Sequence, residues 1–147
     1  MPSIEPKPVF AAEDGGDPIL DHAYVARQSL GDLEFECELL ILFRNQMDKL
    51  LPELRSLGPR SHSAGRDLAH LLRGSAAAIG ATRIAKLAAH YESLLIDAAA
   101  TARHPVAAGA ARADLAVAME ATMAAIDTKL AAMEAGAGRA LEKNQSI

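Results

Sequence analysis

Apolar residues recur every three or four positions through four long segments of this 147-residue chain, and this spacing limits the fold more than any other feature. An α-helix of 3.6 residues per turn gathers such residues on one face. The segments cover residues 33–54, 63–79, 82–100 and 105–134. In the first of them the stripe consists of Phe35, Leu39, Leu42, Phe43, Met47, Leu50 and Leu54. We therefore expect four helices that pack together through these faces.

Glycine, proline and acidic residues mark the ends of the helices. Asp32 is a candidate cap for the 33–54 helix, Gly80 ends the third helix, and Pro105 is well placed to begin the last one. Pro52 is expected to kink the 33–54 helix or to end it early, because proline lacks a backbone donor and clashes with the preceding turn. Short connections make consecutive helices antiparallel neighbours. The predicted fold is all-α, an antiparallel up-down four-helix bundle.

A short additional N-terminal helix is expected ahead of the bundle, with Asp17 or Asp21 as its cap. Residues 1–17 contain prolines and adjacent glycines, and too little apolar surface to offset the entropy of ordering them. We predict a flexible N-terminal tail over 1–17, a helical bundle over 18–134 and a C-terminal tail over 135–147.

Composition excludes several classes of protein. Half of the residues are apolar but only 3% are aromatic, which favours packed helices over a sheet. The formal net charge of −4 argues against a general nucleic-acid binder.

No apolar run approaches the roughly 18 residues that span a bilayer, so no membrane association is expected. The N-terminus shows no signal peptide, which leads us to expect a cytoplasmic protein. The single Cys37 is interpreted as a buried thiol.

The 63–79 helix carries a histidine on its polar side. At 100° per residue, His70 lies opposite a cluster formed by Leu68, Leu72, Ser75 and Ile79. That cluster is the expected core face, so His70 is expected to point away from the core. Arg73, Gly74 and Ala77 follow at three, four and seven residues and flank it.

These neighbours suit the transfer of a phosphoryl group. A neutral imidazole has one nitrogen available as a nucleophile, and the planar guanidinium of Arg73 is well matched to phosphate oxygens. Gly74 costs roughly 1 kcal/mol relative to alanine inside a helix, which indicates a packing or functional reason for its presence. Bare backbone there would allow another protein to approach. The chain has no nucleotide-binding loop and no acidic metal triad, so a metal and an activated aspartyl phosphate would have to come from a partner.

The segment that begins at His70 resembles the motif of the histidine phosphotransfer (Hpt) domain, H-x-L-K-G-S-[AS] followed by a hydrophobic residue and Gly-Ala. Here it reads HLLRGSA and then IGA over residues 70–81, and a weaker likeness extends over roughly residues 20–100. The resemblance implies that His70 is phosphorylated and exchanges its phosphoryl group with aspartates of response-regulator receiver domains. Arg73 stands where the family usually has lysine and keeps the charge. Gln46, on the preceding helix, is a candidate hydrogen-bond partner of the imidazole.

The sequence thus favours a stand-alone phosphotransfer protein of a multistep phosphorelay in two-component signalling. Its expected partners are receiver domains and hybrid sensor histidine kinases, and it is expected to be a monomer without a cofactor or kinase activity of its own. One alternative is a helical adaptor that binds receivers or kinases without carrying phosphate. Another is a bundle that holds a metal, which the spacing of the remaining histidines disfavours. Arg83 and Lys86 are interpreted either as an extension of the positive patch or as solvated charges.

Overall fold

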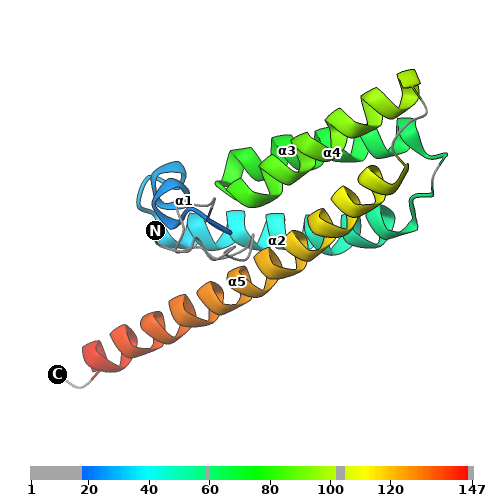
Figure 1. Cartoon of the computed structure of the whole chain (residues 1–147). Helices are drawn as coiled ribbons and strands as arrows, with labels where there is room; N and C mark the ends of the chain where they lie inside the picture. The colour runs from blue at the N-terminus through cyan, green and yellow to red at the C-terminus, as the bar shows by residue number, and fades with distance from the viewer. Residues whose placement is uncertain (1–17, 59, 102–104, 146–147) are drawn as a thin grey trace, which may run out of the picture.

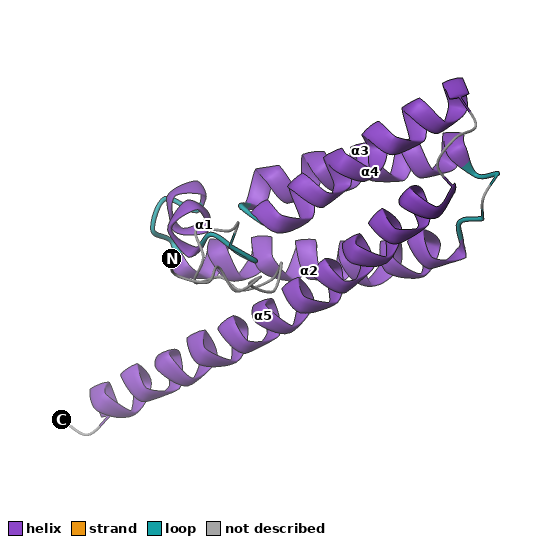
Figure 2. Ribbon diagram, viewed as in Figure 1, coloured by secondary structure: helices purple, strands orange, loops and turns teal. Residues whose placement is uncertain are grey.

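The computed structural model describes residues 18–58, 60–101 and 105–145, and the regular elements in these ranges are five helices (Figure 2). The predicted tail over 1–17 lies outside the described residues. The helices are α1 (His22–Gln28), α2 (Leu33–Ser56), α3 (His62–Ile79), α4 (Thr82–Thr101) and α5 (Pro105–Gln145).

The four long helices form an up-down bundle. Each packs against the next along the chain, and α5 returns to pack against α2, so the bundle closes. In Figure 1, α3 and α4 lie together on one side, while α2 and α5 cross on the other. The short α1 contacts α2 and α3 at one end of the bundle. The predicted fold class is confirmed.

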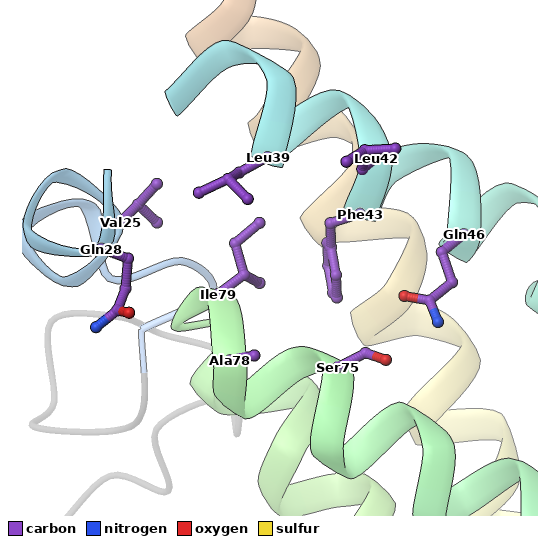
Figure 3. A pocket seen from close by; sticks show the side chains of 9 residues that line it. All are labelled: Val25, Gln28, Leu39, Leu42, Phe43, Gln46, Ser75, Ala78 and Ile79. Atoms are coloured by element: carbon purple, nitrogen blue, oxygen red, sulfur yellow. The ribbon is translucent and has the colours of Figure 1, made fainter. Parts of the chain in front are cut away.

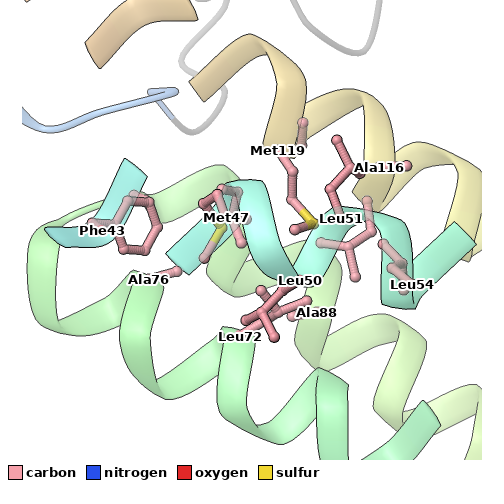
Figure 4. Close-up of a cluster of buried hydrophobic side chains, with 14 of the residues drawn as sticks. Phe43, Met47, Leu50, Leu51, Leu54, Leu72, Ala76, Ala88, Ala116 and Met119 are labelled. Atoms are coloured by element: carbon pink, nitrogen blue, oxygen red, sulfur yellow. The ribbon is translucent and has the colours of Figure 1, made fainter. Parts of the chain in front are cut away.

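The core is built from one face of each long helix, although Phe35 and Leu42 of the stripe predicted for α2 are exposed. Leu40, Leu72, Ile84 and Met119 are fully buried and come from α2, α3, α4 and α5 in turn. Figure 4 shows part of this core, in which Leu50 of α2 lies beside Leu72 of α3, and Leu51 of α2 lies next to Met119 of α5. Burying a leucine or methionine side chain contributes about 1.5–3 kcal/mol, so this shared face supplies much of the stability of the bundle.

Two of the expected helix caps are present. The carboxylate of Asp21 accepts a hydrogen bond from the backbone N–H of Tyr24 at 3.0 Å, and that of Asp32 accepts one from the N–H of Phe35 at 3.2 Å. At the end of α3, Gly80 has a φ of 79°, the left-handed conformation that favours glycine. Its carbonyl accepts a hydrogen bond from the N–H of Asp21 at 2.8 Å, which joins the start of α1 to the α3–α4 turn.

The ends of two helices differ from the sequence prediction. Of the two outcomes expected at Pro52, a kink or an early end, the early end is wrong, because α2 continues to Ser56. Pro52 itself is exposed, while Leu51 and Leu54 beside it are buried, so the packing of the last turn outweighs one missing backbone hydrogen bond. Helix α5 continues beyond residue 134 to Gln145 and projects past the bundle (Figure 1). Alanine, leucine, glutamate and lysine favour helix in that stretch.

Polar contacts also tie α5 to α2. The guanidinium of Arg44 donates to the carboxylate of Asp127 at 2.8 Å, and this hydrogen bond lowers the pKa of Asp127 below its usual value. Arg55 pairs with Glu120 further along the same interface. None of the helices in the described ranges is long and apolar enough to cross a membrane.

Candidate functional site

The imidazole of His70 faces solvent in the middle of α3, and its side chain is 71% exposed. Leu68, Leu72 and Ile79 lie on the opposite side of the helix, where they are buried in the core. The helix is thus anchored by one face and presents the histidine on the other. This is the orientation that the spacing of three and four residues predicts.

One ring nitrogen of His70 is held by two charged side chains. Its Nδ1 lies 3.2 Å from Nη2 of Arg73, one turn along the same helix, and 3.3 Å from Oε2 of Glu92 on α4. Arg73 and Glu92 also pair with each other, with 3.4 Å between Nη1 and Oε1. Because Nδ1 faces into this cluster, Nε2 is the ring nitrogen that remains for a reaction partner.

Glu92 is a residue of the candidate site to which the sequence analysis assigned no role. It is only 15% exposed, because α4 packs closely against α3 at this level. Small residues allow that approach. A Cβ on Gly65 would lie 2.6 Å from Cδ1 of Leu95, and Ala69 and Ala88 are fully buried. The sequence carries a weak signal for it, since Glu92 directly follows Tyr91 of the apolar stripe and falls within the segment that resembles the next helix of the Hpt domain.

The surface next to His70 is open. Gly74 and Ala77 are both exposed, and a Cβ built on Gly74 would meet no atom within 4 Å. No packing contact in the described structure therefore requires glycine at position 74. Its lack of a side chain leaves room for a molecule that approaches from outside.

A groove of about 390 Å³ lies between α1, α2 and the C-terminal half of α3 (Figure 3). Its walls come from three helices, and its lining residues are Val25, Gln28, Leu39, Leu42, Phe43, Gln46, Ser75, Ala78 and Ile79. Gln46 was a candidate partner of the imidazole. The structure instead places it on the wall of this groove, across from Ser75, while Arg73 and Glu92 surround Nδ1 of His70.

The two basic residues at the start of α4 differ in exposure. Arg83 is only 6% exposed, and its backbone N–H donates to the carbonyl of Pro18. Both earlier interpretations assumed an exposed charge, so Arg83 belongs to neither a docking patch nor a solvated face. Lys86 is exposed. No group of three or more histidine, cysteine or acidic residues within the described ranges is arranged to hold a metal ion.

The fold and the site together define a helical bundle that presents a solvent-facing histidine, with a cation and a half-buried acid beside it, on an open surface. The family model of the Hpt domain matches residues 38–136 of the chain, which is more than half of its length and includes His70 and Glu92. The chain belongs to the Hpt domain family, whose members are phosphocarriers.

A solved structure described as a histidine-containing phosphotransfer protein from rice has the same fold. It superposes with a TM-score of 0.65 at 18% sequence identity, and the match covers 79% of this chain and 82% of the rice chain. At that identity the likeness concerns the fold. No curated protein sequence matches the chain.

Proposed function

We propose that the chain is a phosphorelay carrier that accepts a phosphoryl group on His70 from the aspartate of one response-regulator receiver domain and delivers it to another. Hybrid sensor histidine kinases, which contain receiver domains, are the proposed upstream partners. The carrier has no kinase activity of its own, works as a monomer and acts in the cytoplasm with these partners.

The observation that carries this proposal is the solvent-facing imidazole of His70 with the guanidinium of Arg73 beside it. Phosphoryl transfer depends mostly on positioning and on neutralising charge on the phosphoryl oxygens. In this arrangement the ring supplies the nucleophile and Arg73 supplies the positive charge. The remaining requirements, a metal ion and an activated phosphoryl donor, belong to the receiver.

The surface around His70 supports docking of a protein. Leu71 is 47% exposed and lies next to His70 in the chain, and Leu42 on the rim of the groove is 67% exposed. The groove itself is a mainly apolar surface formed by α1, α2 and α3 with Gln46 on its wall, and Gly74 is open one turn from His70. Exposed apolar surface of this kind is typical of sites for protein partners. We propose that the receiver covers it, with Gly74 and Ala77 at the closest approach.

Transfer of label from a panel of phosphorylated receiver domains tests the proposal. The parent protein is compared with His70→Ala and with His90→Ala, which removes another exposed histidine on α4. Label that is stable in base and labile in acid is expected on the parent and on His90→Ala, and it is expected to be absent from His70→Ala.

Label retained on His70→Ala would refute His70 as the acceptor. Stable binding to receivers with no label on the folded parent would support the adaptor, which carries no phosphate. Circular dichroism of each variant shows whether the bundle is intact.

A further inference from the structure

The apolar groove between α1, α2 and α3 is open to solvent at its rim. Leu42 on the rim is 67% exposed, and Phe35, seven residues earlier on the same face of α2, is 41% exposed. Figure 3 shows Val25 of α1 and Ile79 of α3 together at one end of the groove. Exposed apolar surface of this kind is typical of a site that another segment or protein covers.

The described part of the chain begins close to that end of the groove. The carbonyl of Pro18 accepts a hydrogen bond from the backbone N–H of Arg83 at 3.3 Å, and the N–H of Asp21 donates to the carbonyl of Gly80 at 2.8 Å. Gly80 directly follows α3, whose last residues line the groove. Residues 1–17 are therefore tethered beside the groove.

Within that segment, residues 6–10 read PKPVF and have the chemistry that the groove requires. Val9 and Phe10 are adjacent bulky apolar residues. Pro6 and Pro8 restrict the backbone before binding, so less conformational entropy is lost when the segment docks. The groove volume of about 390 Å³ lies within the range of ligand pockets, roughly 300–1,000 Å³, and has room for a phenylalanine ring with a smaller neighbour.

The tether is long enough to bring Phe10 into the groove. Eight residues separate Phe10 from Pro18, and an extended chain of that length spans up to about 26–29 Å. Gly15 and Gly16 allow the chain to turn back towards the bundle. The part of α3 that lines the groove is five residues long, or roughly 6 Å along the helix axis, so the tether reaches all of it.

We propose that residues 6–10 dock in this groove, with Phe10 between α1, α2 and α3, and compete with a receiver that docks over it. A tethered segment has a high effective concentration, so a weak contact fills the groove between encounters with receivers. A second copy of the chain lacks this advantage. The contact itself does not depend on the proposed function, whereas its effect on receivers rests on it.

Fluorescence tests the contact in the full-length chain. The chain has no tryptophan, so Phe10→Trp introduces a single reporter that keeps an aromatic ring in the segment. If the segment fills the groove at least half of the time, adding Leu42→Asp is expected to raise quenching by neutral acrylamide about twofold. Adding Ile41→Asp, outside the groove, is expected to leave quenching unchanged. Ile4→Trp, outside the docked segment, is expected to be quenched equally in all three backgrounds.

Equal quenching of the Phe10→Trp reporter with and without Leu42→Asp would overturn the proposal. Shielding of the reporter that disappears on dilution would overturn it as well, because a second copy would then fill the groove. Circular dichroism of each variant shows whether the bundle is intact.

Receiver affinity tests the competition. A competitor that fills the groove half of the time leaves half of the molecules ready to bind, so Phe10→Asp is expected to lower the Kd for the receiver at least about twofold. Ile4→Asp makes the same change outside residues 6–10 and is expected to leave the Kd unchanged. Equal Kd values for the parent and Phe10→Asp would refute the competition. Because the fluorescence experiment needs no receiver, a shielded reporter in a protein that no receiver labels would refute the proposed function and leave the docked segment in place.

Discussion

The carboxylate of Glu36 on α2 lies 3.1 Å from the ammonium group of Lys129 on α5, although Glu36 is only 4% exposed. The same ammonium donates to Nδ1 of His22 on α1 at 2.9 Å. One lysine thus connects three helices at the end of the bundle. Pairing is what makes burial of the acid tolerable, since an unpaired buried charge is strongly unfavourable.

Lys129→Met is therefore expected to lower the free energy of unfolding by about 1–3 kcal/mol, the penalty for a buried polar group left without its partner. Urea denaturation measures the change, and Lys49→Met, which removes an exposed lysine from α2, is the control. Adding Glu36→Gln to Lys129→Met is expected to restore part of the loss. A loss no larger than that of the control would show that water satisfies Glu36.

Gly80 is expected to tolerate no side chain. Its φ of 79° is strained for other residues, and a Cβ would lie 2.9 Å from Cδ1 of Tyr24 on α1. Gly80→Ala is expected to destabilise the fold by about 1–3 kcal/mol, the cost of a non-glycine residue in this conformation. Gly136→Ala, with open space around the new methyl group, is the control and is expected to be neutral or stabilising. Equal stability of the two variants would mean that the α3–α4 turn relaxes easily.

The sequence alone predicts those features of the fold that depend on residues close together in the chain. The caps at Asp21 and Asp32 and the turn at Gly80 follow from local chemistry, and so does the side of α3 on which His70 lies. Glu92 and Gln46 are different. Glu92 reaches His70 from 22 residues further along, through the packing of α4 against α3 at glycine and alanine contacts, and the separate packing of α2 against α3 places Gln46 across from Ser75. The periodicity of apolar residues predicts which face of each helix is buried, but it does not predict which residues of two packed helices lie side by side.

Tyr91 is expected to make the fold sensitive to alkaline pH. It is 3% exposed, and burial raises its pKa above the ordinary value of 10.0, while the charge of Arg112 opposes that shift. Above this pH the unfolded chain loses the phenolic proton more readily than the folded one, so the free energy of unfolding falls as pH rises through the folded pKa. Tyr91→Phe is expected to flatten that decline.

Absorbance of the phenolate measures this shift directly. The chain has two tyrosines, so Tyr24→Phe leaves Tyr91 as the only titrating phenol. Its midpoint is expected above pH 10 in the folded protein and to fall in urea. A midpoint that is unchanged by unfolding would be at odds with a buried phenol.

Substitution of Gly74 is expected to have opposite effects on the stability of the fold and on docking of a receiver. Gly74→Ala introduces a methyl group into open space within a helix, so the variant is expected to be about 1 kcal/mol more stable than the parent. If a receiver packs against this backbone, the same methyl group is expected to slow phosphotransfer on the order of tenfold, as an added methyl group does in a tight contact. Denaturation and transfer kinetics on the same samples test both effects. Unchanged transfer rates would place the receiver elsewhere.

The groove and its rim are expected to decide how tightly a receiver binds. Leu42 is 67% exposed and lines the groove, whereas its neighbour Ile41 is 45% exposed and points about 100° away around α2. Burying a leucine contributes about 1.5–3 kcal/mol, so Leu42→Asp is expected to raise the Kd for the receiver about tenfold or more. Ile41→Asp adds the same charge outside the groove and is expected to leave the Kd nearly unchanged. Calorimetric titration of the receiver into both variants distinguishes a specific loss from a general effect of charge. If the two variants weaken binding equally, the receiver does not dock over this groove.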